Sequence, residues 1–223
     1  MDKGQILILD EVTSTQDAAI EHDLHVGDAC VSFNQTAGRG RRGNTWDASG
    51  GVAVTVVVEK ATQHLPIAVA ATLAAALNNL TPTHHIGIKW PNDLYVDGKK
   101  LAGILIEQRE GRCLIGVGLN ILEAPLPTAV SLSQLGSEPD KGGVGALVVA
   151  SVLDAVHLDE NTAVSHWRKR DILVGTHQTV CSGDNLVEGI VISIDPCHNL
   201  LLQTDIGILE LPAATSTIVT HCE

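Results

Sequence analysis

The distribution of apolar and polar residues predicts a chain in which strands and helices alternate. Runs of strand length occur at residues 6–9, 29–33 and 51–59, and the last of them is rich in valine. The first of them predicts a short buried strand. Hydroxyl side chains at residues 13–15, with polar residues after them, predict a helix that begins near Ser14. Residues 65–80 are alanine-rich and apolar nearly all round, which predicts a helix packed on several sides.

A β-hairpin is predicted where residues 84–96 and 99–108 flank the dipeptide Asp97-Gly98. This dipeptide favours a two-residue turn, because Asp and Gly both tolerate the backbone angles that the two central positions of such a turn require. Residues 113–121 add a further strand to this antiparallel meander.

The predicted turn sets the register of the hairpin. The numbers of any two residues that face each other across the hairpin should sum to 195, as those of Asp97 and Gly98 do. Asp93 is therefore expected opposite Ala102. By the same count Asn92 is expected opposite Gly103. Lys100 is two residues from Ala102 and is therefore expected on the same face as Asp93. A lysine beside a carboxylate, facing the gap left by two small residues, could hold a phosphate or carboxylate. The alternative is a cross-strand ion pair at the end of a hairpin.

The C-terminal part of the chain changes its pattern. Residues 143–157 and 162–170 predict helices, and from about residue 175 short strands follow one another between Gly, Pro, Asp and Asn. We therefore expect two domains, at residues 1–173 and 174–223, of which the second is a small β-domain.

Composition and charge narrow the class of protein. Hydrophobic residues make up 44% of the 223 residues, which is enough for a core and excludes a largely disordered chain. The formal net charge is −12, so binding to a phosphate backbone lacks its electrostatic driving force. The longest apolar stretch, residues 65–77, is too short to span a bilayer, and the N-terminus lacks a signal-peptide pattern. A cytoplasmic protein with neither a nucleic-acid nor a membrane partner is expected.

Neither the cysteines nor the histidines predict a metal site. The five cysteines are odd in number, lie far apart and include no C-x-x-C pair, which favours reduced structural thiols. They are Cys30, Cys113, Cys181, Cys197 and Cys222. The ten histidines do not coincide with carboxylates or cysteines at the spacing of metal ligands. No metal ligand is therefore assigned.

A long polar loop at residues 34–50 contains the sequence GRGRRG at residues 38–43. This matches the dinucleotide pattern G-x-G-x-x-G, but it leads into a valine-rich strand instead of opening a helix, which argues against a Rossmann site. Three of the seven arginines, Arg39, Arg41 and Arg42, lie here in a strongly acidic chain. Guanidinium groups on a glycine-rich backbone suit a small anion such as a nucleotide. The alternative is a solvated basic loop that pairs with surface acids.

Five motifs, in order and in spacing, resemble those of biotin protein ligases. They are STQ at residues 14–16, QTAGRGRRG at 35–43 followed by Trp46, KWPND at 89–93, KLAGIL at 100–105 and GVGLN at 116–120. The resemblance runs from about residue 10 to 135 and continues more loosely to the C-terminus. It points to the form without an N-terminal DNA-binding domain, because the first predicted strand begins at residue 6.

The resemblance implies an α+β fold and a two-step reaction. The fold is a mixed or antiparallel sheet flanked by helices, of the class II synthetase-like biotin and lipoate ligase type, followed by a small SH3-like β-barrel. In the reaction, biotin and ATP form biotinyl-5′-AMP, and biotin is then transferred to a lysine of a biotin carboxyl carrier protein, such as that of acetyl-CoA carboxylase. Mg²⁺ is expected, held mainly by the substrate phosphates. A strand edge could support a homodimer.

The same resemblance gives individual residues their expected roles. Lys100 and Arg39 would screen the reacting anions, and Asp93 would orient or deprotonate the acceptor lysine. The biotin-binding positions are Ser14, Thr15, Gln35, Gly38, Arg39, Arg41, Lys100, Gly103 and Gly116. The ATP-binding positions are Arg41, Arg42, Trp46, Asn92, Lys100 and Asn120. The arginine loop is expected to close over biotin and the adenylate and to exclude water.

Other functions remain open at this point. A lipoate or octanoate ligase would share the fold and the adenylate chemistry, although the arginine loop favours biotin. A non-catalytic protein that binds biotin or a nucleotide would need no acceptor-side carboxylate, so the presence of Asp93 beside Lys100 and Arg39 argues against it. A nucleic-acid module built on the arginine loop is disfavoured by the net charge of −12.

Overall fold

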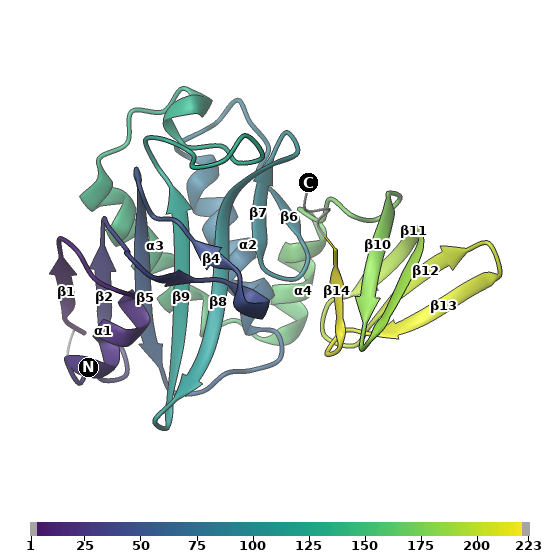
Figure 1. The fold of residues 1–223 in the computed structure, drawn as a ribbon, viewed down its shortest axis with the longest axis horizontal. Coiled ribbons are helices and arrows are strands. Elements are labelled where there is room, and N and C mark those ends of the chain that lie inside the picture. Colours follow the sequence, from purple (N-terminus) through teal and green to yellow (C-terminus); the bar gives the residue numbers. More distant parts are fainter. Residues whose placement is uncertain (1–3, 220–223) are drawn as a thin grey trace.

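A computed structural model describes residues 4–219 of the chain (Figure 1). Its larger part is a seven-stranded sheet in the order β1-β2-β5-β9-β8-β7-β6. The strands are β1 (Ile6–Leu9), β2 (Ala29–Ser32), β5 (Gly51–Val58), β6 (Gly87–Lys89), β7 (Asp93–Val96), β8 (Lys99–Arg109) and β9 (Arg112–Asn120). Strand β1 pairs parallel with β2, and the other pairs are antiparallel. The expected mixed sheet is therefore confirmed.

Helices cover both faces of this sheet. The even-numbered valines of β5 belong to the main core, where α2 (Leu65–Asn78), α3 (Lys141–Ala155) and α4 (Glu160–Arg168) pack together. Val57 points to the other face, into a smaller core beside α1 (Thr15–Glu21). Figure 1 shows α2 and α3 behind the sheet and α1 in front of it. A short 3-10 helix, η2 (Ser133–Leu135), precedes α3. The alternation of residues along β5 thus separates the scaffold face from the face that carries α1.

Strand β1 lies at the edge of the sheet, and the prediction that it is buried is wrong. Ile6 and Ile8 are 47% and 59% exposed. Leu7 and Leu9 point the other way and pack on the smaller core beside α1. An apolar run does not reveal how many sides of a strand are covered, so the sequence pattern could not identify this edge.

Residues 84–96 do not form the single strand that the pattern predicts. They form β6 and β7, which pair antiparallel across a turn at residues 90–92. Pro91 has no N–H group to donate to a ladder, which favours a turn at this point. The meander therefore has one more hairpin than expected.

The predicted register of the β7–β8 hairpin holds only next to its turn. Tyr95 faces Lys100, as the sum of 195 requires. A β-bulge then shifts the pairing by one residue, so that Asp93 faces Gly103 and not Ala102. The same bulge overturns the expectation that Asn92 lies opposite Gly103.

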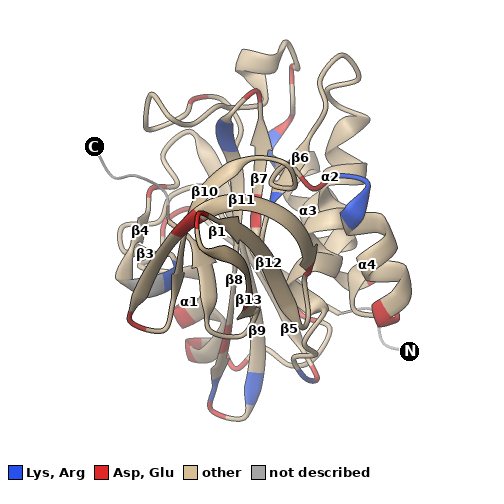
Figure 2. Cartoon of the chain, turned by 90° about the vertical axis from the view of Figure 1, so that its right-hand side faces the viewer, with Lys and Arg blue, Asp and Glu red and all other residues tan. Residues whose placement is uncertain are grey.

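A five-stranded antiparallel sheet in the order β13-β12-β11-β10-β14 follows α4. Its strands are β10 (His177–Ser182), β11 (Asn185–Asp195), β12 (Asn199–Thr204), β13 (Gly207–Pro212) and β14 (Ser216–Ile218). Figure 2 shows this sheet in front of the larger one. The indole N–H of Trp90 donates to the carbonyl of Pro196 at 3.3 Å, which joins the two sheets. The division at residues 173 and 174 stays a prediction.

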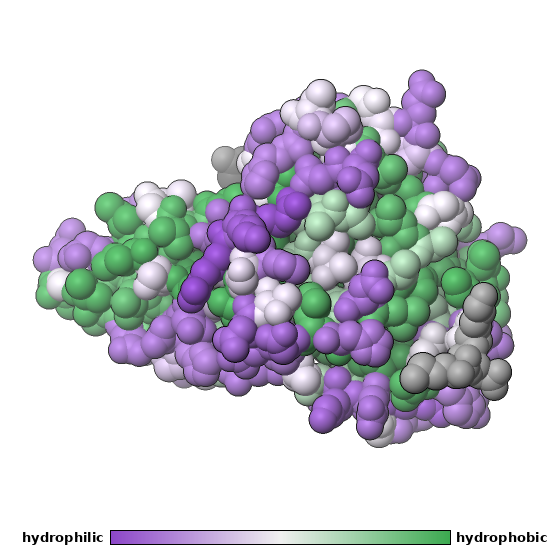
Figure 3. All heavy atoms as spheres, turned by 180° about the vertical axis from the view of Figure 1, so that it is seen from behind, coloured by the Kyte–Doolittle hydropathy of each residue, from purple (hydrophilic) through white to green (hydrophobic). Residues whose placement is uncertain are grey.

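The C-terminal sheet exposes large apolar side chains as well as burying some. The exposed ones are Leu186, Ile190, Ile192, Ile206 and Ile208. Figure 3 shows apolar residues gathered over this part of the molecule. Val180, Val191 and Leu202 are buried in the main core. One face of this sheet is thus packed and the other faces solvent.

The described cysteines are free thiols, and most of them are buried. Cys30, Cys113 and Cys197 are buried, and Cys181 is half-buried. Burial raises the pKa of Cys30 and of Cys197 to about 11, so these thiols stay protonated at neutral pH. Cys222 lies outside the described residues. No helix within residues 4–219 is long and apolar enough to cross a membrane.

Candidate functional site

A cavity of about 290 Å³ opens on the face of the large sheet that carries α1. Most of the residues expected at the site line it, namely Ser14, Thr15, Gln35, Arg39, Arg41, Trp46, Asn92, Asp93, Lys100, Gly103 and Gly116. Residues that were not expected also line it, and they include Gln16, Gly40, Asn44, Thr45, Ala53, Ile104, Leu105, Val117, Gly118 and residues 217–219. The topology thus brings motifs that are distant in sequence to one place.

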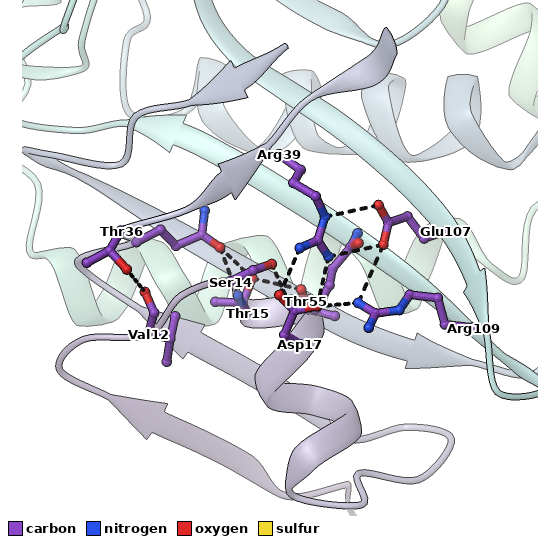
Figure 4. Close-up of polar contacts among 11 residues, drawn as sticks. Val12, Ser14, Thr15, Asp17, Thr36, Arg39, Thr55, Glu107 and Arg109 are labelled. Carbon is purple, nitrogen blue, oxygen red and sulfur yellow. Dashed lines mark hydrogen bonds and ion pairs between the residues drawn. The ribbon is translucent and has the colours of Figure 1, made fainter. Parts of the chain in front are cut away.

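The first turn of α1 supplies an uncharged polar wall. Ser14 caps the helix by accepting from the backbone N–H of Gln16 at 3.2 Å, as the capping pattern predicts. Thr15 donates from its backbone N–H and its Oγ1 to Oε1 of Gln35, at 2.8 and 3.2 Å. Thr55 of β5 donates to Oγ1 of Thr15 at 2.8 Å (Figure 4). These bonds hold Thr15 and Gln35 in single orientations, because each partner fixes the other.

Gln16 is a site residue that the sequence analysis did not assign. Its side chain is 4% exposed, and Nε2 donates to the carbonyl of Leu105 at 3.0 Å. Its Oε1 is buried and has no partner among the described residues. A Cβ atom on Gly116 would lie 2.6 Å from Nε2 of Gln16, so the glycine makes room for this amide. Gln16 therefore leaves one acceptor unpaired in the wall of the cavity.

Trp46 lies over the sheet where a second glycine leaves space. A Cβ atom on Gly118 would lie 2.1 Å from Cε2 of the indole. This distance is far shorter than a van der Waals contact, so only glycine fits beneath the ring. The indole Nε1 is buried and has no partner among the described residues. The Nζ of Lys100 lies 5.6 Å from the centroid of the same ring. The indole thus lines the cavity with an apolar ring, while its N–H lies against the sheet at Gly118.

Lys100 and Asp93 form an ion pair in the cavity wall. Nζ of Lys100 lies 2.9 Å from Oδ2 of Asp93. A Cβ atom on Gly103 would come within 3.2 Å of both side chains, which explains a glycine at the position facing Asp93. Beside them, Nη1 of Arg41 donates to Oδ1 of Asn92 at 3.1 Å, and Nδ2 of Asn92 donates to the carbonyl of Ile104 at 2.6 Å. Two cations and one carboxylate are thus collected on one side of the cavity.

Arg39 belongs to a cluster of four charges. Its Nη1 and Nη2 donate to the two carboxylate oxygens of Asp17 at 2.8 and 3.0 Å. Its Nε and Nη2 also donate to Glu107 of β8 at 3.4 and 3.3 Å (Figure 4). Arg109 pairs with the same two carboxylates. The Arg39 guanidinium holds the pKa of Asp17 below its ordinary value by hydrogen bonding to the carboxylate.

Two of the expected residues that the structure describes do not line the cavity. Asn120 is buried, and its Nδ2 donates to the carbonyls of Lys100 and Val130 at 3.3 and 3.1 Å, so its amide supports the backbone of Lys100. Gly38 lies in the hairpin, where a Cβ atom would be 2.3 Å from the carbonyl oxygen of Trp46. The side chain of Arg42 is outside the described part of the structure.

Residues 217–219 approach the cavity from the C-terminal sheet. No local pattern marks them, because their approach depends on how the two sheets pack. Within residues 4–219, no three His, Cys, Asp or Glu side chains gather in a way that could hold a metal ion.

Residues 9–121 match the model of the biotin/lipoate A/B protein ligase family. A biotin–[acetyl-CoA-carboxylase] ligase of Mycobacterium tuberculosis is 33% identical over 200 residues, which cover 81% of this chain and 74% of that protein. The bifunctional ligase/repressor BirA of Escherichia coli is 29% identical over 234 residues, which cover 94% of this chain and 72% of that protein.

Solved structures show the same fold. A biotin protein ligase from Aquifex aeolicus, in complex with biotin and ATP, superposes with a TM-score of 0.84. The superposition covers 97% of this chain and 99% of that chain at 24% sequence identity. At this identity the likeness concerns the fold, including the small sheet after the larger one.

Proposed function

The chain belongs to the biotin/lipoate A/B protein ligase family, and on this premise we infer that it is a biotin protein ligase. It activates biotin with ATP to biotinyl-5′-AMP and transfers the biotinyl group to a protein. The observation that carries this inference is the cavity, whose wall combines uncharged hydrogen-bonding groups with the cations Lys100 and Arg41. A cyclic urea with a carboxylate tail needs this combination, because the urea requires neutral partners and the carboxylate a cation.

We propose that Thr15, Gln16 and Gln35 bind the ureido ring. A urea carries two N–H donors and one carbonyl acceptor, so it can satisfy the unpaired Oε1 of Gln16. The bonds among Thr15, Gln35 and Thr55 keep this wall rigid before the ligand arrives. We propose that the ring of Trp46, which lines the same cavity, packs beside the adenine ring of ATP.

In the first step an oxygen of the biotin carboxylate attacks the α-phosphorus of ATP. A new P–O bond forms, the bond to the leaving oxygen breaks, and pyrophosphate departs. Both reactants are anions, so their approach requires fixed positive charge. We propose that Lys100 supplies this charge at the carboxylate and α-phosphate, with Arg41 on the nucleotide side.

In the second step the ε-amine of the acceptor lysine attacks the acyl carbon of biotinyl-5′-AMP. An amide bond forms, the bond to the phosphate oxygen breaks, and AMP leaves. The amine must lose a proton, and Asp93 is the carboxylate that lines the cavity beside Lys100. We propose that Asp93 orients the acceptor amine and accepts its proton.

We propose Mg²⁺ as the counter-ion of the ATP phosphates. The side chain of Asn92, which lines the cavity, can offer this ion one oxygen ligand. One or two protein oxygens fit an ion that substrate phosphates mainly hold. Such an ion neutralises charge on the departing pyrophosphate.

We propose that the acceptor is the biotin carboxyl carrier protein of acetyl-CoA carboxylase or of another biotin-dependent carboxylase. The M. tuberculosis relative, which is 33% identical, is named for acetyl-CoA carboxylase. The absence of a nucleic-acid partner, the cytoplasmic location and a homodimer stay predictions. The net charge of −12 supports the prediction that nucleic acid is not a partner.

ATP–pyrophosphate exchange without any carrier protein tests the proposed activity. We expect exchange that depends on biotin and does not occur with lipoate or octanoate, because the polar wall at Gln16 matches a urea and not an alkyl chain. Exchange only with lipoate or octanoate would mean that the chain is a lipoate or octanoate ligase and not a biotin protein ligase. Biotin binding in a calorimeter without exchange with any acid would mean a binding protein that has lost turnover.

Gly118→Ala is expected to weaken ATP binding more than biotin binding. The new methyl group would collide with the indole of Trp46, so the ring must leave its place on the sheet. We expect the KM for ATP to rise about tenfold, as a displacement worth roughly 1–3 kcal/mol would produce. Gly142→Ala is the control, at an exposed helical glycine where a Cβ atom would make only an ordinary contact, 3.4 Å from Oδ2 of Asp140, and it should leave both KM values unchanged. Equal KM values for ATP in the two variants would contradict the role of Trp46.

A further inference from the structure

The hairpin that carries the arginines is too small to hold itself over the cavity. It consists of β3 (Gly38–Arg39) and β4 (Thr45–Trp46), joined by a single 3-10 turn, η1 (Arg41–Gly43). Only two residue pairs connect its strands. Hairpins of this size are at best marginally stable in water, so side-chain contacts outside the hairpin must fix its position.

Backbone hydrogen bonds fix the chain on both sides of the hairpin. Before it, the N–H of Thr36 donates to the carbonyl of Val12 at 2.9 Å, and the N–H of Ala37 donates to the carbonyl of Thr13 at 2.8 Å. After it, the N–H of Leu122 donates to the carbonyl of Gly50 at 2.7 Å. Between these bonds, Arg41 and the three residues from Gly43 to Thr45 are exposed. Between these fixed segments the position of the hairpin depends on its side chains, which include Trp46 against Gly118 and Arg41 at Asn92 as well as Arg39.

Arg39 makes charge-assisted hydrogen bonds to two elements outside the hairpin. Its guanidinium uses Nε, Nη1 and Nη2 on the carboxylates of Asp17 and Glu107, which come from α1 and β8. A guanidinium bound in this way has little capacity left for an anionic ligand. The side chains of Asp17 and Glu107 are 23% and 25% exposed, so solvent screens them only in part. Figure 4 shows Arg39 directed toward these carboxylates.

We propose that Asp17 and Glu107 are positioning residues, which hold the β3–β4 hairpin over the cavity through Arg39 before any substrate binds. Arg39 is then the anchor of the hairpin and not the cation that screens the reacting phosphate, a role left to Lys100 and Arg41. Arg109 balances the cluster, since two guanidinium groups then face two carboxylates. The proposal rests on the proposed function only in naming biotin and ATP as the substrates.

The double variant Asp17→Asn/Glu107→Gln tests this proposal, because both changes keep the shape and remove the charge. In ligand-free protein we expect trypsin to cut the Arg41–Arg42 bond about tenfold faster, measured by mass spectrometry, since charge-assisted bonds of this kind are lost. The KM for biotin in the exchange assay should rise about as much, while kcat at saturation changes less than about threefold. A purely structural loss would not separate KM from kcat in this way.

Asp23→Asn is the matched control. Asp23 pairs with Arg112 and joins the other end of α1 to β9, away from the hairpin. We expect its cleavage rate and KM to equal those of the wild type. If the double variant also matches the wild type in both measurements, the proposal is wrong.

High salt gives a second measurement that needs no change to the wild-type sequence. Salt screens partly exposed charges, so we expect faster cleavage at the Arg41–Arg42 bond in the wild type and in Asp23→Asn, but no further increase in the double variant. A salt effect of equal size in all three proteins would contradict the proposal that the ion pairs of Arg39 hold the hairpin in place. Because cleavage is measured without ligand, it tests the anchor even if the chain does not activate biotin.

Discussion

Lys100→Ala is expected to lower biotin-dependent ATP–pyrophosphate exchange roughly 100-fold to 1,000-fold, the usual loss when one fixed group that stabilises transition-state charge is removed. The ammonium group lies 2.9 Å from Asp93 and lines the cavity, where it can contact both reacting anions. Without it, two anions must approach beside an unpaired carboxylate. The loss should appear in kcat as well as in KM, because the charge acts on the transition state.

Two further variants identify the cause of that loss. Lys99→Ala removes the neighbouring lysine of the same strand, which is exposed and does not line the cavity, and it should leave the exchange rate unchanged. Lys100→Ala/Asp93→Asn removes the carboxylate that Lys100→Ala leaves unpaired. Recovery in the double variant would mean that repulsion by Asp93 causes the loss and that Lys100 has no direct part in adenylation. Continued low activity is the result we expect.

Local patterns predicted the scaffold well, because the physical signals for it are local. The helix cap at Ser14 depends on residues within one turn, and the turn at Asp97-Gly98 depends on two adjacent residues. The apolar helix α2 follows from composition alone. For such elements, the information that determines the structure is contained in a short window of the sequence.

The register error shows where local reasoning ends. The turn predicts Tyr95 opposite Lys100 correctly, but the bulge beyond it moves Asp93 to Gly103. The bulge inserts one residue into β8 without a sequence signal that two-residue alternation could detect. Lys100 and Asp93 meet all the same, so the predicted pair was right although part of its stated geometry was wrong.

The other features of the site that the sequence does not predict depend on tertiary contacts. Asp17 lies in the first turn of α1 and Glu107 in β8, where local patterns indicate only a helix start and a strand, yet both side chains bind Arg39. Gln16 belonged to a quoted motif, but its unpaired Oε1 becomes visible only when its burial is known. Pairs separated by 22 and 68 residues cannot be inferred from spacing in a single sequence.

Asp93→Asn is expected to slow the transfer step far more than adenylation. The amide cannot accept a proton from the acceptor amine, and loss of a general base typically costs roughly 100-fold or more. Exchange should fall less than about tenfold, because Lys100 stays in place. Single-turnover transfer from preformed biotinyl-5′-AMP to the carrier domain measures the second step alone. Its rate in the variant should rise more steeply with pH than in the wild type, because the unprotonated amine must then come from solution.

Asp97→Asn separates this effect from any change in hairpin charge. Asp97 is at the tip of the same hairpin, its side chain is 81% exposed, and it pairs with His84 at 3.4 Å, away from the cavity. We expect it to transfer biotin at the wild-type rate. If Asp93→Asn also transfers at that rate, Asp93 is not the base. If it transfers slowly with an unchanged pH profile, Asp93 orients the amine without accepting its proton, and the lysine must lose its proton to solvent or to the phosphate of the adenylate.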